Sequence, residues 1–288
     1  MLAQTALNTE AHPDGGAFFC CKNYVFDFKK PLVMGIVNVS DDSFSNDGLK
    51  GDSQAAIDKV YRLIDAGADI IDLGAESTRP GAQYCTAEHE IDRLLPVIDA
   101  IKHIGKPISV DTNKTAVMKA VIDAGADIIN DIRALQDEGA VELLAQSDVG
   151  VCLMHMQNDP QNMQDNPVYD NITENVLSFL KARAKICEEA GIAKSRIMLD
   201  PGFGFGKTCA HNVTLFKNLA QFCNTGYPVL VGVSRKRFLG EITGRDLSDR
   251  ACVSAAAAML AVKEGAHIVR VHDVKETKDM ISLYQVLA

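Results

Sequence analysis

The stretch Leu63–Asp72 reads LIDAGADIID, and Val121–Asn130 repeats it almost unchanged as VIDAGADIIN. A looser copy, VKEGAHIVR, occupies Val262–Arg270. In each copy a helical pattern ends at a glycine, which can supply a left-handed cap, and a β-branched run follows at once. Each copy is therefore the joint between a helix and a strand in a repeating unit.

Outward from these joints, the chain contains eight short apolar runs separated by helical patterns. The runs are continuous rather than alternating, as expected for parallel strands buried on both faces. Eight strand-then-helix units in a chain of 288 residues predict an α/β fold, a single-domain TIM (β/α)8 barrel. An open doubly wound sheet is the alternative, although it usually has fewer strands.

The runs share one further property, which is that each ends in a polar or charged residue. In a parallel barrel all strand C-termini lie on one face, where the active sites of such folds are found. The sequence therefore predicts that these distant residues surround one pocket. They are Asn38, Asp72, Asp111, Asn130, His155, Asp200, Ser234 and Arg270.

The N-terminal part of the chain departs from the repeat. Residues 1–16 carry little apolar patterning and are expected to be a mobile tail, with the barrel over residues 17–288. Ala17–Cys21 and Tyr24–Phe28 flank Lys22-Asn23, which predicts a short hairpin. Such a hairpin would cover the N-terminal end of the barrel.

Composition and charge exclude several classes of protein. Lys and Arg number 29 against 38 Asp and Glu, so the net charge is −9, and no basic run exists for a nucleic-acid partner. No apolar segment is long enough to span a membrane, and the N-terminus lacks the features of a signal peptide. The eight cysteines are scattered, without CxxC or zinc spacing. A cytoplasmic protein with reduced thiols is expected.

Three of the strand ends carry side chains that suit a flat heterocycle. Asp111, Asn130 and Asp200 close the third, fourth and sixth runs. A carboxylate accepts two parallel N–H bonds from an amino-pyrimidine edge, and an amide matches a mixed donor and acceptor edge. Helix N-capping is the alternative role for each of them alone.

A basic corner follows the seventh and eighth runs. Ser234-Arg235-Lys236-Arg237 opens a helical pattern, where free N–H groups and the helix dipole favour an anion. Arg270 and His272 are spaced by two at the end of the last run. In an acidic protein this corner indicates a phosphorylated ligand, and a solvated basic turn is the alternative.

Two loops complete the predicted pocket. Asn38–Gly48 is long and polar, suited to a mobile lid, and the Asn38 amide oxygen could bind a hard cation; an ordinary surface loop is the alternative. Phe203 and Phe205 lie within Gly202–Gly206, where they could wall an aryl substrate.

Taken in order, eight motifs resemble the dihydropteroate synthase family of pterin-binding TIM barrels, from about Val33 to the C-terminus. The resemblance implies a transferase that joins 7,8-dihydropterin-6-ylmethyl diphosphate to 4-aminobenzoate and releases pyrophosphate. It also implies Mg²⁺, a homodimer and a sulfonamide target. The motifs are MGIVNVSDDSFSNDG, LGAESTRPGA, SVDTNK, IINDI, LMHMQ, LDPGFGFGK, VGVSRKRFLG and RVHDV.

The resemblance assigns roles to individual residues. Those that it places against the pterin are Asp111, Asn130, Asp200 and Lys236. Those that it places against the diphosphate are Asn38, which would also hold Mg²⁺, Thr78, Arg79, Arg270 and His272. Those that it places around the aminobenzoate are Phe205, Ser234 and Lys236. Those expected to carry the chemistry are Asp111, Lys236 and Arg270.

The sequence departs from the family pattern at two positions. Asp41 stands where proline is common, and Ala75 stands where glycine is common. Because of these departures, the family pattern does not determine the geometry of the first lid when it is closed. Three other functions share parts of the pattern: a pterin-dependent methyltransferase, a non-catalytic pterin-binding protein, and a Schiff-base aldolase acting through Lys236.

Overall fold

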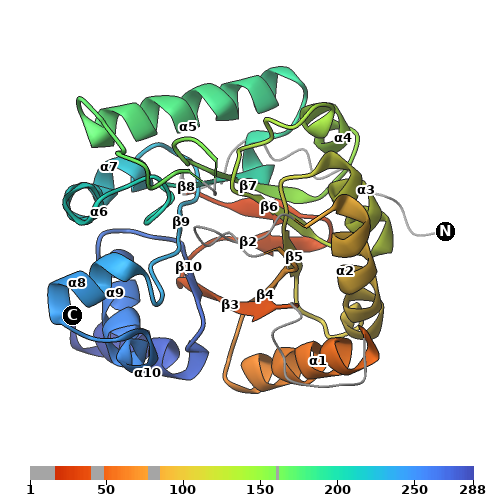
Figure 1. The fold of residues 1–288 in the computed structure, drawn as a ribbon, viewed down its shortest axis with the longest axis horizontal. Helices are drawn as coiled ribbons and strands as arrows, with labels where there is room; N and C mark the ends of the chain where they lie inside the picture. Colours follow the sequence, from red (N-terminus) through yellow and green to blue (C-terminus); the bar gives the residue numbers. More distant parts are fainter. Residues whose placement is uncertain (1–16, 40–48, 77–84, 160–161) are drawn as a thin grey trace.

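The computed structural model describes residues 17–39, 49–76, 85–159 and 162–288. Parallel strands form a ring with helices outside it (Figure 1), in the order β8-β7-β6-β5-β4-β3-β10-β9. A bridge between Leu199 and Val229 joins the two ends of the sheet. The predicted TIM barrel is therefore confirmed. The strands are β3 (Leu32–Asn38), β4 (Ile70–Gly74), β5 (Ile108–Asp111), β6 (Ile128–Asp131), β7 (Gly150–Met154), β8 (Ile197–Asp200), β9 (Leu230–Val231) and β10 (Ile268–Val271).

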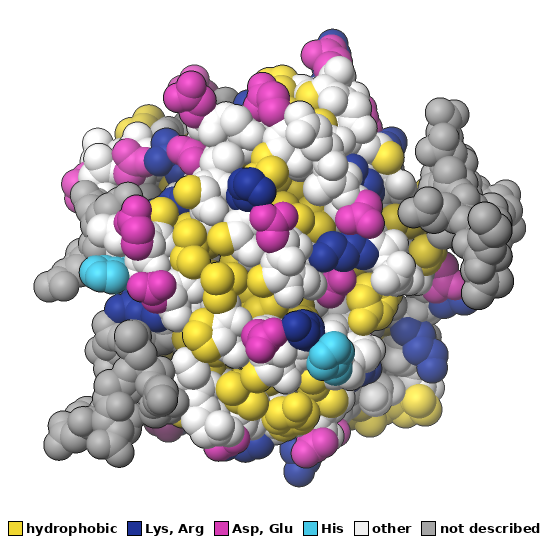
Figure 2. Space-filling model, turned by 90° about the vertical axis from the view of Figure 1, so that its right-hand side faces the viewer, with side chains coloured by type: hydrophobic (Ala, Val, Ile, Leu, Met, Phe, Trp, Pro, Cys, Tyr) yellow, Lys and Arg dark blue, Asp and Glu magenta, His cyan; other side chains and the backbone are white. Residues whose placement is uncertain are grey.

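Helices cover the outer face of the barrel, and the described residues contain no helix long and apolar enough to cross a membrane. The face over α2 and α3 carries acidic and basic side chains interspersed with apolar ones (Figure 2). The helices are α1 (Leu49–Asp65), α2 (Ala87–Ile101), α3 (Thr115–Ala124), α4 (Ala140–Ala145), α5 (Ile172–Glu189), α6 (Cys209–Lys217), α7 (Leu219–Cys223), α8 (Arg237–Thr243), α9 (Ala251–Lys263) and α10 (Val274–Leu287), with short 3₁₀ turns η1 (Lys194–Arg196) and η2 (Leu247–Asp249).

The repeated joint has the predicted geometry. Gly67, Gly125 and Gly265 follow α1, α3 and α9 with φ of 97°, 125° and 100°. The Gly125 N–H donates to carbonyls of the last helical turn, 3.1 Å from Val121 O and 3.2 Å from Ile122 O. A positive φ is cheap only for glycine, so these positions turn each helix directly into the next strand.

The predicted hairpin closes one end of the barrel. β1 (Phe19–Cys21) and β2 (Tyr24–Phe26) pair antiparallel, and Phe19 and Cys21 are buried among the inward side chains of seven barrel strands. Gly150 makes room for this plug, because a Cβ there would lie 2.2 Å from the Phe19 Cζ. The inward side chains are Met34, Ile70, Ile128, Cys152, Met198, Leu230 and Ile268.

The barrel interior changes from apolar to polar along the strands. In register, Asp72 pairs with Ser109, Asp111 with Asn130, and Asp200 with Met154. Registered partners on parallel strands point to the same face of the sheet, so these polar residues join the inward layer above the apolar floor. This layer positions the site.

Candidate active site

The centre of the polar layer is a guanidinium held by two carboxylates. Arg270 Nε donates to Asp72 Oδ2 at 2.7 Å, and Arg270 Nη2 donates to Asp111 Oδ2 at 2.7 Å. Ser109 Oγ donates to the other oxygen of Asp72 at 2.6 Å. Asp72 is fully buried; the sequence placed it at the pocket but gave it no ligand or partner, and so missed its bond to Arg270.

Two carboxylates and one guanidinium leave one negative charge in excess when both acids are ionised. Burial raises the pKa of Asp111, and Arg270 opposes that rise only in part. Burial works to lower the pKa of Arg270, but Asp72 and Asp111 outweigh it and raise that pKa above its ordinary value. The trio therefore favours a positive charge developing nearby.

Asp200 and Asn130 bring the predicted heterocycle-binding groups to the same layer. The Gly202 N–H donates to Asp200 Oδ1 at 2.7 Å, which leaves Oδ2 for a ligand. Burial raises the pKa of Asp200 to about 6, against the effects of the Gly202 N–H and Lys236. Asn130 is buried, and its side-chain amide has no hydrogen-bond partner within the described part of the chain.

Lys236 and Phe205 meet as predicted. Lys236 Nζ lies 4.1 Å from the centroid of the Phe205 ring, a cation–π contact. Burial, followed by Arg270, lowers the pKa of Lys236 to about 8. Phe205 packs in a buried apolar cluster that the sequence interpretation did not single out, although two of its members lie in or beside the LMHMQ motif. Its members are Ile132, Met154, Met163 and Phe205, with Met156 against them.

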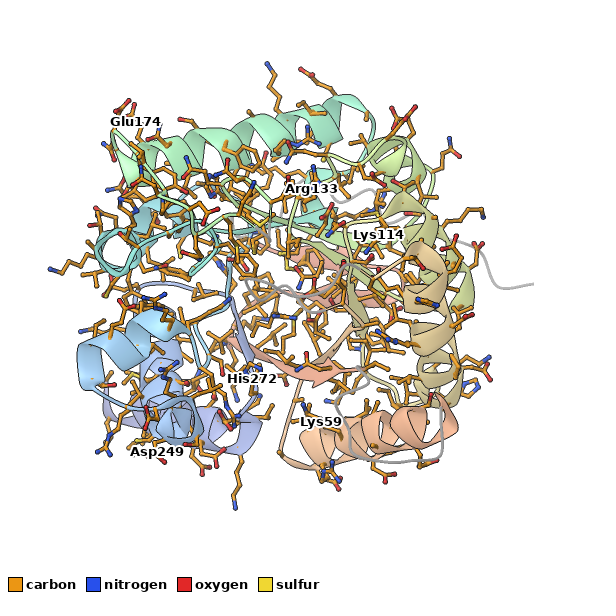
Figure 3. All side chains as sticks on the ribbon, viewed as in Figure 1. Lys59, Lys114, Arg133, Glu174, Asp249 and His272 are labelled. Atoms are coloured by element: carbon orange, nitrogen blue, oxygen red, sulfur yellow. The ribbon has the colours of Figure 1, made fainter. Side chains whose placement is uncertain are left out.

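Ser234 and His272, both predicted for the anion-binding corner, lie together, and the surroundings of His272 make its ring less basic than that of an ordinary histidine. Ser234 Oγ lies 3.0 Å from the ring nitrogen Nδ1 of His272 and accepts from the backbone N–H of His272 at 3.2 Å. Burial, then Arg270, Arg235 and Lys59, lower the pKa of His272 to about 3. Lys59 reaches this corner from α1 (Figure 3). The imidazole is therefore neutral and offers a hydrogen bond rather than a charge.

The other two basic residues of the SRKR segment do not face the site. Arg235 donates to both carboxylate oxygens of Asp273, at 3.0 and 2.5 Å, and its φ of 58° turns the chain sharply. Arg237 is exposed and pairs with Glu241 at 2.6 Å. Of the predicted basic turn, only Lys236 and Ser234 join the pocket.

The predicted residues of the first two loops are placed only in part. Asn38 is exposed at the end of β3, while Asp41, Thr78 and Arg79 lie outside the described residues. Ala75, at the departure from the family pattern, is buried, and its carbonyl accepts from Arg93 at 3.2 Å.

Lys114, which follows β5, binds two acidic side chains, one just after β4 and one on α2. Lys114 Nζ contacts Glu76 at 2.6 Å and the fully buried Glu90 of α2 at 2.8 Å (Figure 3). These contacts link the ends of β4 and β5 to α2. Lys114 therefore supports the rim of the pocket rather than its interior.

A metal would find few protein ligands here. Within the described ranges, no three His, Cys, Asp or Glu side chains are grouped so that they could hold an ion. Asn38 supplies one amide oxygen, which fits Mg²⁺ only if phosphate oxygens and water complete its six positions. The residues present therefore suit an ion that arrives with a diphosphate.

Comparison with known proteins agrees with this geometry. The family model for "Pterin binding enzyme" matches residues 34–272. The chain is 52% identical over 263 residues to the dihydropteroate synthase of Neisseria meningitidis serogroup C, covering 90% of this chain and 93% of that protein. Xanthomonas albilineans dihydropteroate synthase with 4-aminobenzoic acid superposes with a TM-score of 0.88 at 44% identity, over 94% of this chain and 98% of that one. The Burkholderia cenocepacia dihydropteroate synthase complexed with 7,8-dihydropteroate gives 0.87 at 39% identity, over 94% and 96%.

Proposed function

The chain belongs to the pterin binding enzymes, within the dihydropteroate synthase family, and from this premise we propose the roles of its site residues. It is a transferase of folate biosynthesis. It condenses 7,8-dihydropterin-6-ylmethyl diphosphate with 4-aminobenzoate to give 7,8-dihydropteroate and pyrophosphate. One observation carries the roles proposed below, which is the convergence of carboxylates, an amide and a lysine on one buried layer of the barrel.

Asp111, Asn130, Asp200 and Lys236 bind the pterin in this proposal. The free oxygen of Asp200 accepts from the amino-pyrimidine edge, and the unpaired amide of Asn130 meets a ring edge with both a donor and an acceptor. The cluster that contains Ile132 and Met154 packs on the ring face. Asp111 lies beside the methylene group of the pterin in this proposal, because it shares Arg270, a diphosphate ligand, with Asp72.

The proposed chemistry needs no protein nucleophile. The carbon–oxygen bond between the pterin methylene and the diphosphate breaks, and both electrons leave with the diphosphate. The methylene carbon, left electron-poor, forms a bond to the arylamine nitrogen, which then loses a proton to water. The excess negative charge of Asp72, Asp111 and Arg270 stabilises the developing cation.

Asn38, Thr78, Arg79, Arg270 and His272 hold the diphosphate in the proposal. Arg270 keeps N–H groups beyond the two used by Asp72 and Asp111, and neutral His272 donates one hydrogen bond. Mg²⁺ bound beside Asn38 would neutralise charge on the departing pyrophosphate. The residues of the chain orient that group for departure.

Phe205, Ser234 and Lys236 border the aminobenzoate. The Phe205 ring offers an apolar wall, and the Lys236 ammonium beside it suits the carboxylate of the substrate. The Ser234 hydroxyl, whose hydrogen is given to His272 Nδ1, lies beside this subsite as a polar neighbour. A sulfonamide, which has the same aryl amine and an anionic group opposite it, would compete for this subsite.

The decisive experiment measures pyrophosphate release from the pterin diphosphate with and without 4-aminobenzoate. We expect release to depend on the amine, to equal dihydropteroate formation, and to stop with EDTA and return with Mg²⁺. Release that ignores the amine would overturn the function. Turnover that is unaffected by EDTA would overturn the Mg²⁺ proposal alone.

The pKa values of two site residues predict the pH profile. Asp200, with its pKa raised to about 6, is protonated as the pH falls through 6 and then cannot accept two N–H bonds. Lys236, with its pKa lowered to about 8, loses its charge as the pH rises through 8. We expect kcat/KM for the pterin diphosphate to form a bell between these limits. Asp200→Asn should make the acid limb less steep, because Asp111, whose pKa burial also raises, still takes up a proton there; a limb that keeps its full slope belongs to other groups, including the substrate.

We also propose a homodimer formed through the outer helices. α9 is apolar on every side, and a helix of that kind is normally buried. Its exposed Leu260 lies with Ile242 of α8 and Leu283 of α10 among the exposed large apolar side chains. Because α9 packs along α10, we propose that the side of the molecule that carries Leu260 and Leu283 is the contact with a second copy of the chain.

Light scattering should report twice the chain mass of 31.1 kDa. Leu260→Glu should shift that mass toward the monomer, because it places a charge in the apolar contact. Val168→Glu is the matched control, since Val168 is exposed but lies outside these helices. A wild-type protein that is monomeric at micromolar concentration would contradict the proposal.

We propose the cytoplasm as its location, in which the eight free thiols stay reduced. We propose one domain for residues 17–288, because a single ring of strands takes part in every segment that the structure describes within that range.

A further inference from the structure

A lysine with no role so far is one of the most enclosed charged groups of the molecule. Lys207 directly follows the loop Gly202–Gly206, and its side chain is 3% exposed. Its Nζ lies 2.8 Å from Gly202 O, 2.9 Å from Phe205 O and 3.2 Å from His155 O. It also lies 3.0 Å from His155 Nδ1. Burial lowers the pKa of Lys207 to about 7, but four acceptors surround the nitrogen, one more than the hydrogens of an ammonium, and they favour that charged form.

His155 completes this cage as an acceptor. Burial, then Lys207, lower the pKa of His155 to about 2, so the ring is neutral and its Nδ1 can accept from the ammonium. The ring is held in place by Phe179 at 5.1 Å and Tyr169 at 6.0 Å between centroids. The Lys207 nitrogen, with its hydrogens engaged, is not placed as a nucleophile.

Lys207 is one of several groups that hold this loop, and it is the one that binds two of the loop carbonyls at a single point. Gly202, Gly204 and Gly206 have φ of 69°, 83° and 60°, and in the resulting turn the carbonyls of Gly202 and Phe205 point to the same nitrogen. Carbonyl oxygens that converge without water repel one another unless a cation lies among them. A Cβ at Gly202 would lie 1.9 Å from His155 O, so the loop and the end of β7 are in direct contact.

The loop carries the residue that the proposed function places against the aminobenzoate. Phe205 gives its carbonyl to Lys207 and its ring to Lys236, so the two lysines bind opposite ends of one residue. Any rotation of the Phe205 backbone would move the ring relative to Lys236 Nζ. The position of the aryl wall therefore depends on the cage.

We propose that Lys207 is a positioning residue for the aminobenzoate subsite: its buried ammonium gathers the carbonyls of the Gly202–Phe205 loop and fixes the Phe205 ring against Lys236. This inference rests on the proposed function, because it concerns the second substrate of that reaction. It assigns to Lys207 and His155 an effect on one substrate rather than on the whole site.

The test compares Lys207→Met with two other variants. Lys207→Met keeps the length of the side chain and removes the ammonium, so we expect KM for 4-aminobenzoate to rise at least about 10-fold, as for a misplaced binding group. KM for the pterin diphosphate should rise much less, because Asp111 and Asn130 come from other strands and Asp200 meets this loop only through the Gly202 N–H. His155→Phe keeps the aromatic packing but removes the Nδ1 acceptor, and should give a smaller rise of the same kind. Lys217→Met, at an exposed lysine of α6, is the matched control.

Thermal melting of each variant separates folding from positioning. If Lys207→Met does not fold, the His155→Phe variant decides the question by the same ratio of the two KM values. Equal changes in both KM values, or unchanged KM values in a folded variant, would overturn the inference. A wild-type enzyme without amine-dependent pyrophosphate release would overturn the proposed function instead, so the two failures are distinguishable.

Discussion

Replacing Arg270 with alanine is expected to lower kcat/KM by on the order of 10³-fold and to destabilise the fold by about 3–5 kcal/mol. The loss of activity follows from removing the donors proposed for the leaving diphosphate. The loss of stability follows from Asp72, which is fully buried and bonded to Arg270 at 2.7 Å. Without that partner it stays as an uncompensated buried charge or takes up a proton.

Two measurements check this expectation, pyrophosphate release and urea unfolding. Arg237→Ala is the control, because Arg237 is exposed and pairs only with Glu241 of its own helix. An exposed pair of this kind contributes little, so the control should keep both activity and stability. Near-normal turnover of Arg270→Ala would remove Arg270 from the chemistry. A loss of activity at full stability would mean that Asp72 finds another partner.

Asp200→Asn is expected to lower kcat/KM for the pterin diphosphate by roughly 10–100-fold, the loss of the charge-assisted hydrogen bond of about 1.5–3 kcal/mol that the free oxygen Oδ2 would accept. Stability should change little, because the amide oxygen can still accept from the Gly202 N–H. KM for 4-aminobenzoate should change much less.

The matched control for Asp200→Asn is Asp131→Asn. Asp131 is equally buried at a strand end, but its two oxygens accept from the backbone N–H groups of Arg133 and Leu135, each at 2.7 Å. An amide can keep only one of these bonds, so this variant should lose stability and keep its kinetic constants. If both variants lose activity equally, Asp200 has no specific role in pterin binding.

The fold could be predicted from the sequence because its signals are local. The glycine after each helix and the apolar run that follows fix a helix-to-strand joint without reference to the rest of the chain, and Gly67 and Gly125 have the expected left-handed φ. The count of such units then points to a barrel. The hairpin was predictable for the same reason, from two short runs around Lys22-Asn23.

Only those site residues that lie at the end of a strand or just after it could be predicted from the sequence. Asp111, Asn130, Asp200 and Lys236 are where a barrel must put them. Asp72 and Arg270 gave a weaker signal, since each is a lone charge in an apolar strand and must have a partner. Their strands, β4 and β10, are separated by β3 in the sheet, so no spacing in the sequence reveals the pairing.

Other features had no readable signal. A short basic segment such as SRKR does not indicate which of its side chains point inward. Here the φ of 58° at Arg235 turns the chain so that Lys236 points inward. Lys207 reads as an ordinary lysine after a glycine-rich loop. Its burial depends on three carbonyls and a histidine ring that only the folded loop brings together.

The plug at the floor of the barrel has a consequence for the order in which the chain folds. Phe19 fits against Gly150, and the Lys22 N–H donates to Asp148 O at 2.9 Å, so the first described strand docks on a strand made from the middle of the sequence. During synthesis, the hairpin must wait until β7 has left the ribosome. Contacts between such distant residues form slowly, because the long intervening loop must close first. The floor of the barrel is therefore sealed late, and amide exchange at Lys22 would time that event.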